Sequence, residues 1–239
     1  AGHPADFISE GVDQTRGWFY SLLAVSTMHA DKPAYRAVVS NDMVLDAKGK
    51  KMSKSRGNVV DPMALVSRLG ADASRWYLLA SRPVWLPVRF DEGELVELRN
   101  RVFGTLTSTY AFFAMYANAD GFDVGGADDA TPARPRGVFD RWLLSRAHRL
   151  VRDVTADLEA YETSRAGKRV ADFVVEDLSN WYVRRNRRRF WKGAMTPDKR
   201  EGYETLRTAL LAVVRLMAPF APFLTDAMHR ALLGGAPGA

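Results

Sequence analysis

A lysine-rich pentapeptide carries the strongest chemical signal in this sequence. Lys51–Ser55 (KMSKS) lies in a run in which residues 48–56 hold five cations. Gly49 and Gly57 flank the core of the run and allow it to move. Mobile ammonium groups can follow the negative charge that grows on a departing polyphosphate, and serine hydroxyls and backbone amides can add hydrogen bonds. The pattern therefore predicts a phosphate-handling loop, in preference to a solvated basic turn.

A second segment, residues 10–19 (EGVDQTRGWF), could hold a nucleoside. Gly11 lets a ligand approach the backbone, and Asp13 can accept hydrogen bonds from a ribose diol, as an acidic residue does in dinucleotide-binding folds. The same residues also fit an ordinary strand-to-helix turn in which Asp13 is the N-cap. Both interpretations remain open on the residues alone.

A third segment, residues 182–192, contains six cations and no anion. On a helix, Arg184 and Arg188 lie one turn apart, as do Arg185 and Arg189. Such ridges match the phosphates of a nucleic acid, which give affinity without reading sequence. The alternative is a structural role for these arginines, and the candidate contacts are then Asp172, Glu176, Asp177 and Trp181.

The elements expected around these motifs change in kind near residue 90. Strands and short helices are expected before it, and a helical period of apolar residues follows from residue 92. This predicts an α/β segment over residues 1–90 and an all-α segment over residues 91–239. The α/β part is expected to contain a helix at 14–29, strands at 37–40 and 43–45, helices at 62–69 and 72–81, and an extended stretch at 83–90. The all-α part is expected to contain a loop at 118–137 and a last helix capped by Thr225.

Composition excludes several classes of function. The 239-residue chain has no cysteine, so disulfides and thiolate metal sites are excluded, and its four histidines are too dispersed to predict a metal site. No apolar run reaches the roughly 20 residues needed to span a bilayer. The net charge of +6 suits an anionic partner. The chain lacks an initiator methionine and a signal-peptide pattern, so we expect it to begin within a longer protein.

Lys51–Ser55 resembles the KMSKS signature of the class I aminoacyl-tRNA synthetases. The resemblance implies the C-terminal half of a Rossmann-type catalytic domain, followed by an anticodon-binding helical bundle. It also implies a ligase that uses ATP and Mg²⁺ to activate an amino acid and then transfers the amino acid to tRNA. By this resemblance Lys54, assisted by Lys51, stabilises the departing pyrophosphate, while Ser53 and Ser55 shape the ATP-binding loop.

The segment at residues 10–19 is similar to the isoleucine-specific branch of that family, and the arginine segment resembles the start of its anticodon-binding domain. The match implies tRNA contacts from Arg184, Arg185, Arg188 and Arg189. It further implies a backbone contact from Met43 or Val44 to adenine, although Asp42 stands where the family often has glycine. The implied roles on the substrate side are ribose binding for Gly11, Asp13 and Gln14, an isoleucine-pocket wall for Trp18, and proximity to the adenylate for Glu10.

Taken with this resemblance, the sequence predicts part of a cytoplasmic, monomeric isoleucine–tRNA ligase whose partners are ATP, isoleucine and tRNA(Ile). The family's other signature, His-x-Gly-His, does not occur in the chain. Because proximity and orientation supply much of enzymic rate, we expect the isolated chain to be inactive. Two alternatives remain: a non-catalytic RNA-binding module, and a piece of the related valine-specific enzyme.

Overall fold

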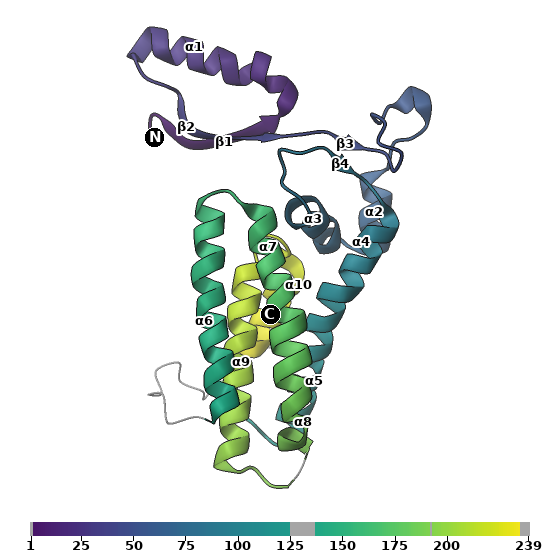
Figure 1. Cartoon of the computed structure of the whole chain (residues 1–239), viewed down its shortest axis with the longest axis vertical. Helices are drawn as coiled ribbons and strands as arrows, with labels where there is room; N and C mark the ends of the chain where they lie inside the picture. Colours follow the sequence, from purple (N-terminus) through teal and green to yellow (C-terminus); the bar gives the residue numbers. More distant parts are fainter. Residues whose placement is uncertain (1, 125–136, 192, 235–239) are drawn as a thin grey trace.

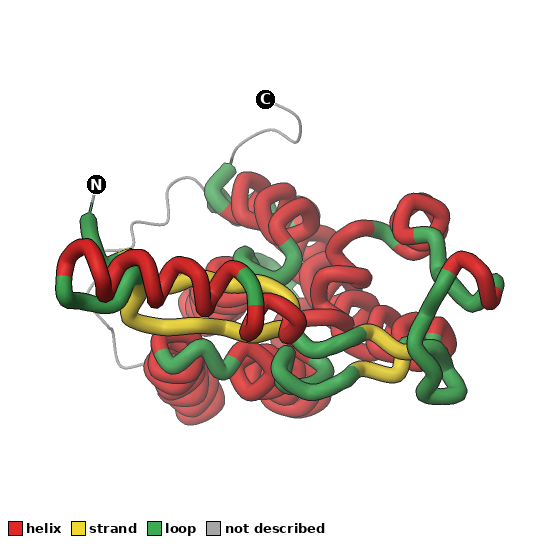
Figure 2. The backbone as a smooth tube through the Cα atoms, turned by 90° about the horizontal axis from the view of Figure 1, so that it is seen from above, coloured by secondary structure: helices red, strands yellow, loops and turns green. Residues whose placement is uncertain are grey.

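The computed structural model describes residues 2–124, 137–191 and 193–234, and it consists of a small α/β layer above a long helical bundle (Figure 1). Most of the expected loop at 118–137, and Lys192 of the arginine segment, lie outside the described residues. The view from above shows both strand pairs in one layer that lies over the helices (Figure 2).

The first part of the layer is a β-α-β unit. Strand β1 (Ala5–Gly11) leads through a short 3₁₀ helix, η1 (Val12–Arg16), into α1 (Trp18–Ala30). Strand β2 (Tyr35–Asn41) returns parallel to β1, with Phe7 opposite Ala37 and Glu10 opposite Ser40. The expected single helix at 14–29 is therefore two helices. They separate at Gly17, whose backbone angles (φ −134°, ψ −110°) are not helical.

The second part of the layer frames the lysine-rich segment. Strand β3 (Val44–Leu45) pairs in parallel with β4 (Val88–Arg89). Between these strands lie η2 (Lys54–Arg56), α2 (Pro62–Leu69) and α3 (Ala71–Ala80). The start of α2 is as predicted, because the Asp61 side chain accepts a hydrogen bond from the Met63 amide and Pro62 occupies the first helical position.

The bundle is built from long helices, two of which contain π-helical stretches. The first runs through α4 (Glu92–Arg99), η3 (Asn100–Gly104) and α5 (Thr105–Ala119). After α6 (Val138–Glu159), the next runs through α7 (Thr163–Asp172), η4 (Phe173–Val183) and α8 (Arg184–Trp191). Helices α9 (Pro197–Met217) and α10 (Pro222–Leu232) complete the described part.

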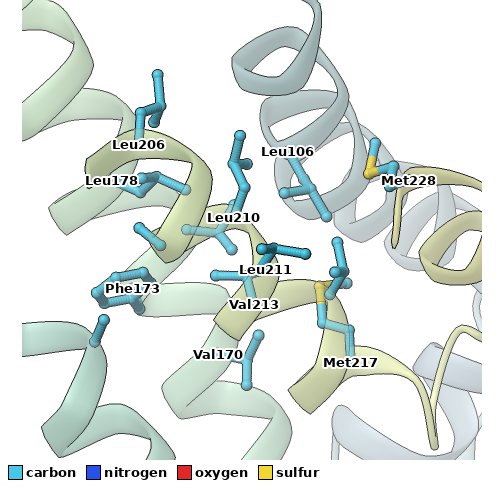
Figure 3. Packing of buried hydrophobic residues seen from close by; sticks show 14 of the residues in the cluster. Leu106, Val170, Phe173, Leu178, Leu206, Leu210, Leu211, Val213, Met217 and Met228 are labelled. Atoms are coloured by element: carbon cyan, nitrogen blue, oxygen red, sulfur yellow. The ribbon is translucent and has the colours of Figure 1, made fainter. Parts of the chain in front are cut away.

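The bundle surrounds one large apolar core (Figure 3). Leu106, Val170 and Leu210 come from three different helices and are fully buried there. A smaller core joins α2, α3, α4 and β4. Helix α3 contributes to both cores, since Trp76 packs into the large one and Tyr77 into the small one. The α/β layer is therefore anchored to the bundle through a shared helix.

Polar contacts strengthen this anchor at the start of α10. The Asp72 carboxylate on α3 accepts hydrogen bonds from the amides of Phe223 and Leu224, at 3.3 and 2.7 Å. Asp72 thus caps α10 although it lies 151 and 152 residues upstream of the two amides, which corrects the expected cap at Thr225. Thr225 lies inside α10, because the helix already begins at Pro222, and its hydroxyl donates to the carbonyl of Ala221.

In the described part of the chain, we find no helix that combines the length and apolar character needed to cross a membrane.

Candidate functional site

The lysine-rich loop begins where β3 ends. The Asp46 amide donates to the carbonyl of Lys50 at 2.9 Å, and Leu45 forms an antiparallel bridge with Lys51. Gly49 (φ +75°) and Gly57 (φ +63°) occupy the left-handed region that disfavours other residues. The two glycines therefore turn the backbone at either side of the pentapeptide, in the places where the sequence predicted mobility.

Two polar side chains outside the pentapeptide hold the base of this loop. The Asp46 carboxylate accepts from the amides of Lys48 and Lys50, at 3.0 and 2.8 Å. Asn58 donates its amide N–H to the other Asp46 oxygen at 2.8 Å, and the Asn58 oxygen accepts from the Ser53 amide at 2.9 Å. The hydrogen bond from Asn58 is the main cause of a lowered pKa at Asp46, followed by the backbone bond from Lys50.

One side chain of the pentapeptide packs against the protein core, and three others are exposed. Met52 packs against the small core, so the pentapeptide is tied to α2 and α3. Lys51, Lys54 and Ser55 are exposed, and the Ser53 and Ser55 hydroxyls lie 3.3 Å apart. The loop therefore presents the two predicted catalytic ammonium groups to solvent with their backbone held in place.

Arg89 adds a cation that sequence analysis did not single out. It lies opposite Leu45 in the β3–β4 pair, and a Cβ placed on Gly49 would lie only 3.2 Å from its Nε. Glycine at position 49 thus admits the Arg89 guanidinium against the turn. Together with the lysines of the loop, Arg89 makes this end of the layer strongly basic.

In the predicted ribose segment, two glycines make room for two polar side chains. A Cβ on Gly11 would lie 2.6 Å from an Asp13 carboxylate oxygen, and one on Gly17 would lie 2.8 Å from the Gln14 side-chain oxygen. Asp13 does not cap a helix, because no side-chain cap is formed at the start of η1. Instead, the Gln14 oxygen accepts from the Trp18 amide at 3.0 Å and its nitrogen donates to Asp13.

The remaining predicted substrate residues lie at the end of the β1–β2 pair. Glu10 is exposed beside Ser40, whose buried hydroxyl has no hydrogen-bond partner among the described residues, and Trp18 is 44 % exposed at the start of α1. Their side chains are therefore available to a ligand at this edge.

The backbone of Met43, one of the two residues predicted to contact adenine, already forms hydrogen bonds within the chain. The Met43 amide donates to its neighbour Asp42 at 2.6 Å, and the Met43 carbonyl accepts from Val88 at 3.0 Å. Both backbone groups of Met43 thus have partners already. Val44 lies in β3 and is exposed.

Among the four predicted tRNA-contacting arginines, Arg189 faces the interior. Its guanidinium forms a two-pronged ion pair with Asp140 at 2.8 and 2.9 Å, and a further one with Asp198 at 3.0 Å. Asp140 is fully buried and also accepts from the Tyr182 hydroxyl at 2.6 Å. Burial alone would lower the pKa of Arg189, but the Asp140 hydrogen bonds raise it. The geometry at Arg189 fits the structural alternative, with partners that sequence analysis did not name.

The other arginines of α8 face outward. Arg184 and Arg188 are exposed, and so is Arg187, which the sequence analysis did not single out. At 3.6 residues per turn, these three lie within about 100° of one another around the helix. Arg185 stacks on Trp181, with its Cζ 3.9 Å from the ring centroid.

Two acidic residues that had been considered as partners for these arginines are paired elsewhere. Asp177 pairs with Arg146 at 2.8 Å, and Asp172 with Arg101 at 3.7 Å.

The three candidate segments occupy different parts of the molecule. Figure 1 shows β1, α1 and the loop that follows β3 along the upper layer, whereas α8 lies toward the opposite end of the bundle. Within the described ranges, no group of three or more His, Asp or Glu side chains is placed to hold a metal ion. The arrangement suits an extended polyanion that reaches from one end of the molecule to the other.

Two family models match separate parts of the chain. Residues 1–88 match tRNA synthetases class I (I, L, M and V), and residues 140–237 match the anticodon-binding domain of tRNA ligase. The first match contains the ribose segment and the lysine-rich loop, and the second contains α8.

Curated relatives match nearly the whole chain. An isoleucine–tRNA ligase of Porphyromonas gingivalis is 51% identical over 231 residues, or 97% of this chain and 20% of its own length. One of Deinococcus radiodurans is 50% identical over 97% of this chain and 21% of its own length. The chain thus spans about a fifth of the length of these relatives.

Solved structures share the fold at lower identity. Methionyl-tRNA synthetase of Mycobacterium tuberculosis, in complex with methionyl-adenylate, is 24% identical with a TM-score of 0.79, over 98% of this chain and 45% of that one. A leucine counterpart from Agrobacterium radiobacter, in a ternary complex with tRNA, is 24% identical with a TM-score of 0.67, over 97% of this chain and 28% of that one. Together with the two family models, this likeness establishes a partial Rossmann-type α/β layer followed by a helical anticodon-binding domain.

Proposed function

The chain belongs to the class I tRNA synthetases, and from this premise we propose that it supplies the pyrophosphate-facing loop and the first tRNA-contacting helices of an isoleucine–tRNA ligase. The observation that carries the proposal is the lysine-rich loop, held at its base while Lys51 and Lys54 are exposed. The isoleucine name of relatives at about half identity supports that branch over the valine-specific one.

In the proposed reaction, the isoleucine carboxylate attacks the α-phosphate of ATP, and pyrophosphate leaves. Negative charge grows on the leaving group as its bond to the α-phosphate breaks. Lys54 and Lys51 stabilise that charge, which favours the transition state over the bound substrate. The Ser53 and Ser55 hydroxyls lie close enough together to hydrogen-bond the same phosphate group.

The β1–η1 edge is proposed to hold the nucleoside and the amino acid. Gln14 orients Asp13 through a 3.0 Å hydrogen bond, which supports a carboxylate directed at the ribose hydroxyls beside Gly11. Exposed Trp18 and Glu10 supply the apolar wall and the acidic group near the adenylate. For adenine, we retain a backbone contact from Val44 or Met43, and Met43 would have to release its bond to Asp42.

The tRNA contacts are proposed for the outward arginines of α8. Arg184 and Arg188 offer exposed side chains to phosphates, and stacked Arg185 retains its N–H edge for the same purpose. We add Arg187 to this set because it lies on the same face. Arg189 is proposed to hold α8 in place through Asp140 and to contribute to tRNA binding only indirectly.

The remaining partners follow from this role. Mg²⁺ is proposed to enter as the counter-ion of ATP, since magnesium is commonly bound through substrate phosphates and few carboxylates. We propose that the intact ligase is monomeric and cytoplasmic, with tRNA(Ile), isoleucine and ATP as its ligands.

Transplanting the chain tests this function. Residues 1–239 would replace the matching 231-residue segment of the Porphyromonas gingivalis relative, and Lys54→Ala would be made in that chimera. We expect isoleucine activation to slow by roughly 30- to 1000-fold, corresponding to about 2–4 kcal/mol for losing a contact made mainly in the transition state. Isoleucine binding should change little. Single-turnover adenylate formation and equilibrium isoleucine binding provide the two measurements.

The matched control is Lys48→Ala, which removes an exposed lysine from the same loop outside the pentapeptide. It should slow adenylation much less. Equal losses in the two variants would mean that the loop acts through its total charge, and an unchanged rate for Lys54→Ala would remove Lys54 from the mechanism.

A further inference from the structure

Asp46 and Asn58 lie outside the KMSKS pentapeptide, yet their side chains contact each other across its base. We propose that these two residues form a clasp that sets the conformation of the loop and thereby positions Lys51 and Lys54 for the leaving phosphates. They act as positioning residues, because neither needs to touch the substrate. The inference rests on the proposed phosphate role of the loop.

The hydrogen-bond directions in the clasp are fixed by the backbone. The Ser53 amide is a donor, so the atom of Asn58 that faces it must be the oxygen. The Asn58 nitrogen therefore faces Asp46, which as a carboxylate is an acceptor only. The second Asp46 oxygen is already occupied by the Lys48 and Lys50 amides. Each group thus has one orientation that satisfies all of its partners.

The clasp connects both halves of the loop. Asp46 organises the turn at residues 46–50, and Asn58 holds the pentapeptide through the Ser53 amide and, at 3.3 Å, the Lys51 carbonyl. The backbone on either side of Met52 is therefore fixed while the lysine ammonium groups remain exposed. Losing one contact of the clasp should loosen the whole loop, because Asp46 and Asn58 each serve several bonds.

A reciprocal exchange of the two residues tests the clasp. In Asn58→Asp, two carboxylates face each other. In Asp46→Asn, two amide nitrogens face each other, and flipping Asn58 would only turn a donor toward the Ser53 amide. In the double variant Asp46→Asn/Asn58→Asp, the new amide again faces a carboxylate, and the net charge equals that of the original chain. The double variant does not restore the bond to the Lys51 carbonyl, because a carboxylate cannot donate. Each single variant should therefore loosen the loop, and the double variant should recover part of the original conformation.

Limited trypsin digestion of the full chain, mapped by mass spectrometry, measures how readily the backbone of the loop is cleaved. Cleavage after residues 48–56 should accelerate about tenfold or more in each single variant, as expected for losing a hydrogen bond to a charged group. The double variant should be cleaved more slowly than either single variant, because the bond between positions 46 and 58 is restored while the bond to the Lys51 carbonyl is not. Thermal unfolding should change little in all three. Asn180→Asp, which also replaces an amide beside a carboxylate (Glu176), is the matched control and should leave loop cleavage unchanged.

Adding inorganic pyrophosphate separates the clasp from the function on which it rests. Pyrophosphate should slow cleavage within the loop of the original chain, with weaker protection in the single variants and recovery in the double variant. The clasp proposal is wrong if trypsin cleaves the single variants, and pyrophosphate protects them, to the same extent as the original chain. Fast cleavage without recovery in the double variant also overturns it. A third outcome is that pyrophosphate protects neither the original chain nor any variant, while the single variants are still cleaved faster and the double variant still recovers. The contact between Asp46 and Asn58 would then stand. The proposed phosphate role of the loop would fail, and the positioning of the lysines for phosphates would fail with it.

Discussion

The guanidinium groups of Arg188 and Arg189 are adjacent in sequence and have opposite surroundings. Arg189 is 11 % exposed and paired with the fully buried Asp140, whereas Arg188 is exposed on the outer face of α8. Gly202 leaves room for the inner guanidinium, because a Cβ at this position would lie 3.0 Å from the Arg189 Nε. One position of the basic segment therefore maintains the fold, and its neighbour is available to a partner.

Substituting the two neighbours separately should reduce stability by very different amounts. Arg189→Gln leaves the buried Asp140 carboxylate without its main partner, so we expect a loss of about 3–5 kcal/mol in the free energy of unfolding. Arg188→Gln removes an exposed cation and should cost about 0–1 kcal/mol. Urea unfolding of the two variants, side by side, measures the difference. Similar losses in both would contradict the assignment of Arg189 to the interior.

The outer arginines should instead control how salt weakens RNA binding. In Arg184→Gln/Arg188→Gln, each lost phosphate contact should flatten the slope of log K against log salt by roughly 0.7–0.9, or roughly one to two in total. Stability should remain near that of the original chain. Titrating tRNA at several salt concentrations provides the slope. An unchanged slope in the folded double variant would mean that these arginines do not contact RNA.

At the scale of elements, the approach of α3 to α7 joins the layer with the lysine-rich loop to the bundle. A Cβ on Gly167 of α7 would lie 2.3 Å from the Ala80 Cβ and 3.1 Å from its Cα. Arg75 of α3 also donates to the carbonyls of Pro219 and Phe220, at 2.9 and 3.2 Å. Small residues and helix-end contacts therefore fix the distance between the two parts.

Gly167→Ala should destabilise the chain even though alanine favours helices. The added methyl group meets the neighbouring backbone, and such overpacking costs about 1–3 kcal/mol. Gly104→Ala is the control, because no described atom outside its own stretch of helix lies within 4 Å of the added Cβ. It should be neutral or stabilise by up to about 1 kcal/mol. Thermal unfolding of both variants decides the point, and a stabilised Gly167→Ala would show that the close approach does not constrain the helices.

The elements themselves were largely predictable, and the exceptions have physical reasons. Local signals identified the start of α2, where Asp61 caps the helix and Pro62 is its first residue. The cap of α10 was not predictable, because Asp72 reaches it from another helix. Gly17 was the available signal for the break before α1, although glycine alone does not distinguish a break from a tolerated position.

The site was predictable to a similar extent. The type and spacing of residues in the lysine-rich loop predicted a phosphate-handling role, which stays a proposal, and the structure shows Lys51 and Lys54 exposed on that loop. The clasp partner of Asp46 lies 12 residues away, and only the fold shows that Asn58 faces it. For the arginine segment, helical spacing grouped Arg185 with Arg189, but the buried Asp140 lies 49 residues upstream of Arg189 and no local pattern indicated it.

At the scale of the whole molecule, buried carboxylates make stability depend on pH. Burial alone would raise the pKa of Asp157, but hydrogen bonds from Arg169 and Arg165, both at 2.6 Å, lower it below its usual range. A lowered pKa in the folded state means that the contribution is complete above the unfolded value, near about 3.9, and is lost as the pH falls through the folded value.

Asp157→Asn tests this dependence. The variant should unfold at a clearly lower temperature than the original chain at pH 7, because two arginines lose their charged partner. The gap should narrow as the pH falls below about 4, where the carboxylate of the unfolded chain takes up a proton, and it should close as the pH falls through the lowered folded value. Melting curves between pH 7 and pH 2 provide the comparison. A gap that stays constant over that range would mean that the ionised carboxylate is not what stabilises this part of the bundle.

The exposed apolar surface of α1 bears on what the isolated chain can do. Tyr20, Val25 and Met28 are 65 %, 62 % and 80 % exposed, and a helix that is apolar on all sides is normally covered by other elements. The β1–η1 edge, with its proposed nucleoside-binding residues, therefore lacks opposing protein surface among the described residues. Without an opposing wall, substrates are not held in a reactive orientation.

The most direct test of the proposed function is isoleucine-dependent ATP–pyrophosphate exchange by the isolated chain, the intact Porphyromonas gingivalis relative and the chimera that carries residues 1–239. We expect no measurable exchange from the isolated chain and exchange by the chimera within about tenfold of the intact relative, a difference of about 1.4 kcal/mol in the barrier. A folded chimera that binds isoleucine but does not exchange pyrophosphate would contradict the assignment of the lysine-rich loop. Exchange by the isolated chain at the rate of the intact relative would contradict the claim that it holds only part of the site.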